Sequence, residues 1–429
     1  MDFERLIEQR HKSDTYSYFT HGEAYYLARN TAIMERKKYI YLEGIGVSEN
    51  PFGANHKLPS GHFKKIVDQK VMYQLGNGVK FSQEQDLDQY FDDPFDEVMI
   101  DLGIEASKKS EAWLYGFKDN GQLKFTQLPS EQLTPIFDEY GRLEKMVRSF
   151  VNDGYHYMFV YDDVSITQYR KKSTDKSFKL YGVHGHWTEY NEFNGEQIGE
   201  PIEHGFGTVP FIPLYNNREH TCDLHNIKTL IDTYDIINSD FANNIDDMQD
   251  AFFTLKGYTG DTKNLAEFMR QLKMYKAVPV GDDGDVQAQQ LQIPVEARKV
   301  FLERIEKDIY KFAMAVDLSN TGGNSITNVY IKSMFADLDL KCDQFESELR
   351  KFIKRLVSFI NGTENTDYTY DCSFTREMIV NTNEVVDNLV KLSGVISNKT
   401  IRELIPFSID LEQEEIRIAD QVGDISLVE

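Results

Sequence analysis

The 429-residue sequence lacks the features of a secreted or membrane-embedded protein. It has only three cysteines, Cys222, Cys342 and Cys372, and because they are odd in number and far apart they predict buried thiols rather than a disulfide framework. No apolar run approaches the length of a membrane span, and the start, MDFERLIEQRHKSDTY, lacks the apolar core of a signal peptide. We therefore expect a protein that is made and works in a cytoplasm, with no membrane partner.

Positive charge is also scarce. Lys and Arg together number 47 against 70 Asp and Glu, which gives a formal net charge of −23 at pH 7. Tight binding of nucleic acid depends on clustered Lys and Arg that release counterions from phosphates, so the composition argues against it. A surface of this charge still allows a polyanion to pass along it without sticking.

Patterns for catalysis and metal binding begin in several places but are incomplete in each. The run Gly322–Ser325 lacks the lysine and the spacing of a phosphate-binding loop. The turn Asp282–Asp285 lacks the later ligands of a calcium loop, and His220, Cys222 and His225 have no fourth zinc ligand at characteristic spacing. We interpret all of these residues as structural or solvated, and we predict no catalytic residue, no cofactor and no metal site.

Two differently patterned halves are present. Between Glu111 and Gly207, short alternating runs are separated by Asp-Gly, Asn-Gly and Tyr-Gly pairs, which is typical of antiparallel hairpins. The prolines of segment 208–215 suit an edge strand. After Asn216, apolar residues recur at helical spacing in three stretches, 227–248, 297–316 and 331–360. The last stretch predicts a helix of roughly 30 residues, about 45 Å long.

Two inserts separate these predicted helices. Residues 251–293 alternate between strand and helix patterns and predict a small α/β module. Residues 317–328, DLSNTGGNSITN, can hold no core, and their glycines and asparagines permit the positive φ angles and the mobility that a moving loop needs. The predicted fold class is mixed α+β, with two or three domains.

Three collinear segments carry a family resemblance. Asn50–Val79 reads NPFGANHKLPSGHFKKIVDQKVMYQLGNGV; Val209–Asn217 reads VPFIPLYNN and runs into LIDTYDIINSDFANNIDDMQDAFFTLKG at Leu230–Gly257; Leu392–Ile418 reads LSGVISNKTIRELIPFSIDLEQEEIRI. They resemble the N-terminal, central and C-terminal signatures of the portal proteins of long-tailed bacteriophages. One departure is Asn324–Asn328, where many relatives have a Ser-Gly-x-Ala/Ser run that enters the last long helix.

The resemblance implies a portal-type subunit with an antiparallel-sheet and helix wing, a long-helix stem and a small α/β clip insert. Its parts would be a wing domain at 1–220, a first stem helix at 221–250, a clip domain at 251–293, a second stem helix at 294–316, a tunnel loop at 317–328, a long helix returning to the wing at 329–384 and a short crown-like segment at 385–429. Heterologous contacts that close by rotation would make a ring, with twelve copies in the family's virions and sometimes thirteen in isolated protein.

The same resemblance directs attention to three groups of residues. The tunnel loop, which would project toward DNA, contains Ser319, Asn320, Thr321, Gly322, Gly323, Asn324 and Ser325. The basic candidates on the channel wall are Lys299, Arg304, Lys307 and Lys311, and those for docking a motor on the clip are Lys263, Arg270, Lys273 and Lys276. Salt bridges between neighbouring helices are the alternative role for these charges.

A portal subunit would form the channel through which an external motor packages double-stranded DNA and through which the genome is later ejected. The implied partners are further copies of the chain, double-stranded DNA, the large terminase subunit, scaffold and major capsid proteins, and a head–tail adaptor. The protein would be assembled in the host bacterial cytoplasm and end at the portal vertex of the virion. Two alternatives are a metal-dependent DNA-processing enzyme that uses Asp246, Asp247 and Asp250, and a minor structural capsid protein without a channel.

Overall fold

The structure of the chain is a computed structural model that describes most of its length. The described residues are 2–42, 46–49, 54–175, 177–184, 205–247, 252–256, 285–289, 295–319, 327–376 and 382–392, with isolated positions between 395 and 417. They fall into two compact units. Unit 1 comprises Met1–Thr15, Ile66–Cys222 and Met314–Glu429, and unit 2 comprises Tyr16–Lys65 and Asp223–Ala313.

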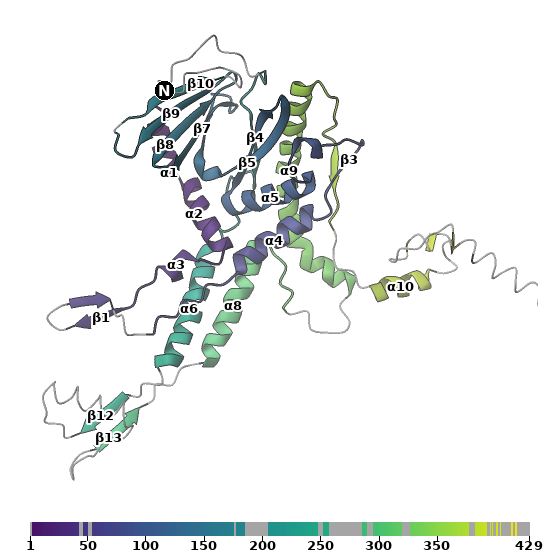
Figure 1. Cartoon of the computed structure of the whole chain (residues 1–429). Helices are drawn as coiled ribbons and strands as arrows, with labels where there is room; N and C mark the ends of the chain where they lie inside the picture. Colours follow the sequence, from purple (N-terminus) through teal and green to yellow (C-terminus); the bar gives the residue numbers. More distant parts are fainter. Residues whose placement is uncertain are drawn as a thin grey trace, which may run out of the picture. The chain divides into compact units, whose positions relative to one another are not determined.

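Unit 1 combines antiparallel sheets with helices (Figure 1). Its helices are α1 (Phe3–His11), η1 (Asp88–Tyr90), α5 (Phe95–Lys109), η2 (Ser130–Gln132), α9 (Asn328–Glu364) and α10 (Thr382–Lys391). Its strands are β3 (Val79–Phe81), β4 (Glu111–Asp119), β5 (Gln122–Leu128), β6 (Leu133–Phe137), β7 (Leu143–Asn152), β8 (Tyr155–Tyr161), β9 (Ile166–Lys172), β10 (Lys179–His184), β11 (Phe211–Tyr215) and β14 (Cys372–Phe374). Helix α4 (His62–Leu75) begins in unit 2 and ends in unit 1.

The predicted hairpins are confirmed. Strands β10-β9-β8-β7-β6 form a five-stranded antiparallel sheet and β11-β4-β5 a three-stranded one. Between β7 and β8 the turn residues Asp153 and Gly154 both have positive φ, 47° and 75°, which is the turn geometry that matches the twist of paired strands. Strand β11 lies at an edge, as its prolines predict, with Pro213 opposite Trp113 of β4.

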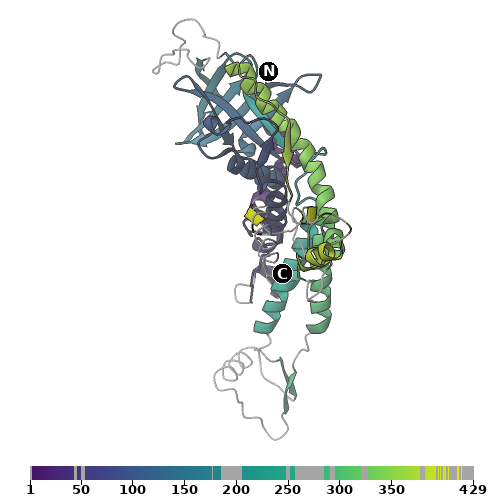
Figure 2. The same ribbon diagram turned by 90° about the vertical axis from the view of Figure 1, so that its right-hand side faces the viewer.

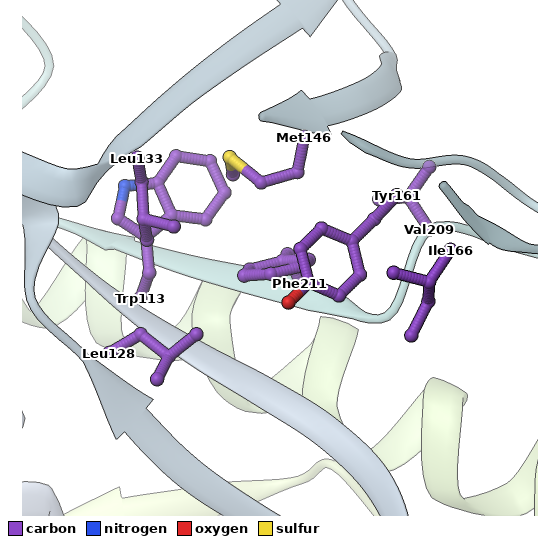
Figure 3. Packing of buried hydrophobic residues seen from close by; sticks show 8 residues of the cluster. All are labelled: Trp113, Leu128, Leu133, Met146, Tyr161, Ile166, Val209 and Phe211. Carbon is purple, nitrogen blue, oxygen red and sulfur yellow. The ribbon is translucent and has the colours of Figure 1, made fainter. Parts of the chain in front are cut away.

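The two sheets share one hydrophobic core, shown in Figure 3. Its buried side chains come from strands of both sheets and from the segments next to them: Trp113, Leu128, Leu133, Met146, Tyr161, Ile166, Val209 and Phe211. The indole N–H of Trp113 donates to Glu111 Oε1 at 2.9 Å, so its polar atom is satisfied inside the core. This packing fixes the orientation of β11 and its free edge.

Helix α9 is the longest element of unit 1. It has 37 residues, about 55 Å at 1.5 Å per residue, and it packs beside β11 (Figure 2). The predicted apolar stripe is confirmed, because side chains such as Phe345, Leu349 and Phe352 are fully buried and stabilise the fold by about 1.5–3 kcal/mol each. The helix starts where Thr327 accepts a hydrogen bond from the backbone N–H of Tyr330, at 3.3 Å.

Unit 2 contains the two shorter helices that follow the sheets in sequence. Its elements are α2 (Asp14–Tyr26, whose first residues belong to unit 1), α3 (Thr31–Met34), β1 (Tyr39–Leu42), β2 (Gly46–Glu49), α6 (Lys228–Asp247), β12 (Phe252–Lys256), β13 (Asp285–Gln289) and α8 (Val295–Ala313). Strand β12 pairs with β13 in antiparallel fashion. The rest of the small α/β module expected at 251–293 lies outside the described residues.

The compact units do not follow the boundary expected at residue 220. Residues 16–65 fall within the expected wing range, yet they cluster with α6 and α8 in unit 2. Residues 1–40 contain three helices, α1, α2 and α3. The physical reason lies in the polar side chains of α6, described below. None of the described helices is long and apolar enough to cross a membrane.

Candidate functional site

Helices α6 and α8 of unit 2 pack against one another (Figure 1). They lie within the stretches expected as two stem helices, at 221–250 and 294–316, and α6 begins seven residues after the start of the first stretch. On α6 the predicted apolar stripe begins with Ile227 and Ile231, which are fully buried. From there on, however, the fully buried positions on α6 are polar.

Three polar side chains, four residues apart, form this buried stripe. Asp235 and Ser239 are fully buried and Asn243 is 2% exposed. Each accepts a hydrogen bond from the backbone of an extended segment, at every second residue: Asp235 from Ser60 N–H at 2.9 Å, Ser239 from Leu58 N–H at 3.0 Å and Asn243 from His56 N–H at 2.6 Å. We call this arrangement the polar ladder. It ties residues 56–60 to α6 and so explains why the N-terminal segment belongs to unit 2.

Further side-chain pairs extend the same attachment along α6. Asp232 binds the hydroxyl of Tyr25 and the ammonium of Lys228, the latter at 2.8 Å. Arg36 reaches Asp240 through two parallel N–H···O bonds of 2.9 and 3.1 Å, the geometry that makes an arginine–carboxylate pair specific. Each turn of α6 from Asp232 to Asn243 therefore forms at least one hydrogen bond with residues 16–60.

Asp235 makes the most hydrogen bonds of the three side chains in the polar ladder. Its second carboxylate oxygen accepts a hydrogen bond from the side-chain amide of Asn30, which also donates to the carbonyl of Ser60 at 3.1 Å. Burial raises the pKa of Asp235 above its ordinary value of 3.8, although the hydrogen bonds from Asn30 and Ser60 act in the opposite direction. The ladder thus contains a buried carboxylate held by uncharged donors, with nearby His62 the charge that favours its ionised form.

Helix α8 presents a basic stripe on its solvent side. Arg304, Lys307 and Lys311 are exposed and stand three and four positions apart, so they lie on one face, opposite the buried Ile305 and Ile309. Arg304 is partly compensated by Asp308 one turn away, at 3.9 Å. The fourth expected residue, Lys299, is also exposed but lies on another face, together with Glu303 and Glu306. The structure therefore brings three of the four candidates together.

Apolar side chains are exposed on another part of α8. Phe301 is 47% and Phe312 is 53% exposed, although both belong to the stripe that periodicity assigned to a buried face. Phe301 also borders a small cavity of about 330 Å³, lined in addition by Ile237, Asp240, Ala297 and Arg298. In a single subunit this surface has no counterpart among the described residues that would bury it.

Two of the three expected groups of site residues cannot be placed. Of the tunnel loop, only Ser319 lies within the described residues, and residues 320–325 lie outside them. The clip residues Lys263, Arg270, Lys273 and Lys276 also lie outside. The described ends of the loop are ordered by local contacts, since Ser319 N–H donates to Asp317 Oδ1 at 2.9 Å and Thr327 begins α9.

The alternative metal sites find no support in the part of the chain that the structure describes. There, no group of three or more His, Cys, Asp or Glu side chains is arranged to hold an ion. Asp246 pairs with the imidazole of His56, while the side chain of Asp247 and all of Asp250 lie outside the described residues. His220 packs its ring on Tyr215 with centroids 4.0 Å apart, and His225 Nδ1 lies 3.0 Å from the hydroxyl of Tyr18.

Comparison with known proteins identifies the family of this architecture. The model of the family described as "Phage portal protein, SPP1 Gp6-like" matches residues 7–422, nearly the whole chain. The chain belongs to this portal family. It is 29% identical to the portal protein of Bacillus phage SPP1, over 94% of this chain and 83% of the relative. It is 28% identical to the portal protein of Clostridium phage phiCD119, over 90% of this chain and 92% of the relative.

Solved structures resemble the chain more distantly. The neck of an empty gene transfer agent particle has a chain that is 8% identical with a TM-score of 0.46, covering 80% of this chain and 88% of that one. A chain of the native gene transfer agent virion is 9% identical with a TM-score of 0.42, covering 92% and 94%.

Membership of the portal family confirms the resemblance and the mixed helix and antiparallel-sheet fold expected from sequence. It makes the chain a phage portal protein, a structural component of a virion whose family provides the channel for DNA packaging. Sequence reasoning missed the polar ladder, which lies in the middle of the central signature of the portal family. The available signal was the i, i+4 spacing of Asp235, Ser239 and Asn243, which places three polar side chains on one face of the helix.

Proposed function

We propose that α6 and α8 line the DNA channel of a ring made of copies of this chain, and that Arg304, Lys307 and Lys311 face the DNA. The supporting observation is the basic stripe, which is exposed, lies on one face and points away from the packed side of the helix. Three cations per subunit, one of them partly compensated, give weak phosphate contacts distributed around the ring. The negative charge of the whole chain, −23, keeps DNA from adhering elsewhere.

The exposed apolar side chains of α8 give a reason for the ring. Phe301 and Phe312 are large and half exposed, Phe301 borders the cavity beside Ile237, and a second copy of the chain would bury both side chains. In such a ring, one face of α8 would contact the neighbouring subunit and bury the phenylalanines, while another face would present the basic stripe to the channel. Twelve copies are the number that the portal family resemblance implies.

The remaining expected residues belong to the same proposal. Residues 319–325 would act as the tunnel loop that contacts DNA during packaging and retention, and Lys263, Arg270, Lys273 and Lys276 would dock the large terminase subunit on the clip. Work on the DNA would come from that external motor, and the chain itself would carry no catalysis. Scaffold, major capsid protein and a head–tail adaptor would bind elsewhere on the ring, which is assembled in the bacterial cytoplasm.

The test replaces the stripe and measures packaged DNA. In an in vitro or plasmid-complemented packaging assay, the triple variant Arg304→Gln, Lys307→Gln, Lys311→Gln should reduce nuclease-protected DNA several-fold while negative-stain images still show rings with a central hole. Lys299→Gln, compared with the single change Lys307→Gln, is the matched control and should package normally. Normal packaging by the triple variant would exclude these residues as DNA contacts, and solid particles or monomers from the unaltered protein would exclude the channel.

The enzyme alternative has its own measurement. Purified protein is incubated with linear duplex DNA and Mg²⁺, with Asp246→Asn in parallel. Because Asp246 is paired with His56, we expect no metal-dependent cleavage by either protein. Cleavage that depends on Mg²⁺ and is abolished by Asp246→Asn would establish a DNA-processing activity.

A further inference from the structure

Unit 1 contains a large open groove beside the edge strand β11. Its volume is about 1040 Å³, at the upper end of what small-ligand pockets offer. Three pieces of chain form its walls: β11 with the residues that precede it, the turn between β6 and β7, and the C-terminal part of α9. None of these residues belongs to the helices assigned above to the channel.

The floor of the groove is apolar. Phe211 and Val209 are buried beneath it, and Phe359 of α9 forms a half-buried side wall. Phe137, at the end of β6, is 45% exposed on the opposite rim. An apolar side chain that covers the exposed parts of Phe137 and Phe359 gains about 25 cal/mol for each Å² of apolar surface removed from water.

The rim of the groove is basic. Lys351, Lys354 and Arg355 are exposed on the face of α9 that borders it, and Arg142 contributes from the β6–β7 turn. Lys351 is paired with Glu348 at 2.7 Å and Arg142 with Asp138 at 4.0 Å, but among the described residues no carboxylate forms a salt bridge with Lys354 or Arg355. No Asp or Glu is among the described residues that line the groove. This is a concentration of positive charge on a protein of net charge −23.

The free edge of β11 is closed to strand addition at its centre. Asn216 N–H donates to Ser110 and Gly116 N–H donates to Pro210, both at 2.9 Å, so even-numbered residues of β11 pair with β4 and odd-numbered ones face the free edge. Pro213 therefore stands at the edge without an N–H, and its carbonyl already accepts from Arg355 at 3.5 Å. A ligand must be recognised through side chains rather than by extending the sheet.

From these observations we infer that the groove is a docking site for an acidic peptide segment of another protein, one that carries an aromatic or large aliphatic side chain. The carboxylates would pair with Lys354 and Arg355, and the apolar side chain would cover Phe137 and Phe359. Duplex DNA fits the rim but not the floor, because the phosphate backbone that it presents offers no apolar group to bury there. The charge of the rim and the apolar floor together select the peptide.

The dimensions of the groove agree with a short segment. From Lys351 to Phe359, α9 rises about 12 Å, and β11 extends over about 13 Å. An extended peptide covers this length with about four residues, or a helix with about two turns. Lys351 and Arg355, one helical turn apart on this rim, match acidic residues spaced two apart on a strand or four apart on a helix.

The test is an unbiased selection of peptide ligands. A display library of random twelve-residue peptides is panned against the purified full-length protein and, in parallel, against the double variant Lys354→Glu, Arg355→Glu. We expect the unaltered protein to enrich peptides of net negative charge with at least one aromatic or large aliphatic residue. In fluorescence anisotropy, the best of these peptides should bind the double variant at least tenfold more weakly, and raised salt should weaken its binding to the unaltered protein.

Matched controls separate this site from general charge effects. Lys332→Glu changes another exposed cation of α9, remote from the groove in sequence, and should leave peptide affinity unchanged. Unfolding temperatures of all variants should agree within a few degrees. Enrichment of neutral or basic peptides, equal binding by the double variant, displacement of the peptide by a short duplex DNA, or loss of rings in the double variant would each overturn the inference. The last result would mean that a second copy fills the groove.

Discussion

The side-chain oxygen of Asn243 accepts a hydrogen bond from the backbone N–H of His56 at 2.6 Å, although 187 positions separate the two residues in sequence. A helix that packs on an extended backbone through polar side chains allows fewer alignments of the two segments than one that packs through leucines, because each hydrogen bond requires a narrow range of distance and angle. In this portal protein the polar ladder therefore fixes which five residues, 56–60, lie along α6. Several measurements can test this description of the molecule.

Truncation of the ladder should destabilise unit 2. Ser239→Ala and Asn243→Ala each remove the acceptor of a half-buried or buried backbone N–H and should lower the free energy of unfolding by about 1–3 kcal/mol. Urea unfolding followed by circular dichroism measures the change. Asn244→Ala, at the next position of the same helix, is the matched control and should change stability by less than about 0.5 kcal/mol. Equal effects at 243 and 244 would contradict the ladder.

The stability difference between the unaltered protein and Asp235→Asn should depend on pH. Burial raises the folded-state pKa of Asp235, so the folded chain holds this proton more tightly than the unfolded chain. Its contribution is fully present below the ordinary pKa of 3.8 and is lost as the pH rises through the raised value. Urea unfolding of both proteins between pH 3.5 and 7 should show the unaltered protein losing stability relative to the variant as pH rises. A relative gain would show that the hydrogen bonds outweigh burial.

The Arg36–Asp240 pair should contribute modestly. Both side chains are about one-third exposed, so solvent screens the pair and its coupling energy should be about 0.5–1 kcal/mol. A double-mutant cycle with Arg36→Ala and Asp240→Ala measures it. Arg36→Lys keeps the charge but loses the two parallel bonds, and it should recover less than half of the coupling. Full recovery by lysine would mean that charge alone matters here.

Two glycines with similar backbone angles should respond differently to alanine. Gly78 and Gly121 have φ of +71° and +85°, and alanine at either position costs about 1–2 kcal/mol because L residues disfavour this region. At Gly78 the added Cβ would also collide with the carboxylate of Asp96, which accepts the N–H of Val79 at 2.9 Å. Nothing lies within 4 Å of a Cβ at Gly121. Gly78→Ala should thus lower the unfolding free energy by at least 1 kcal/mol more than Gly121→Ala in urea titrations.

Salt dependence should reveal the role of the basic stripe. If Arg304, Lys307 and Lys311 contact phosphates, translocation through rings carrying Lys307→Gln should be less sensitive to added NaCl than translocation through unaltered rings, because fewer counterions are exchanged. Packaging rate against log salt concentration measures this slope. Lys299→Gln rings should show the slope of the unaltered protein. A common slope for all three proteins would remove Lys307 from the DNA path.

Periodicity predicted the elements whose burial follows hydrophobicity. The stripe of α9 through Leu349 and Phe352 and the edge position of β11 are both visible in the sequence, because a 3.6-residue repeat and a proline have direct structural consequences. The family resemblance was equally readable, and the match over residues 7–422 confirms it.

Features that depend on distant partners were not readable. The apolar repeat at 227–248 gave no sign that Asp235 and Asn243 take buried positions, which they do because the backbone of residues 56–60 supplies their hydrogen bonds. Phe301 and Phe312 belong to the apolar repeat at 297–316 and are half exposed, since helical spacing does not tell a core from a subunit surface. The groove beside β11 is formed by three segments that are far apart in sequence, so no local sequence pattern predicts it.

The geometry of helix and extended chain limits how many hydrogen bonds the polar ladder can contain. Four residues of helix advance about 6.0 Å, whereas two residues of extended chain advance about 6.4–6.8 Å, so the two repeats slip by about half an ångström at each rung. The donors and acceptors are therefore in register over a short stretch only. Three rungs keep the accumulated slip near about 1 Å, within what side-chain rotation can absorb. These three hydrogen bonds therefore fix the alignment of residues 56–60 with α6, and further repeats of the same spacing would be too far out of register to extend the ladder.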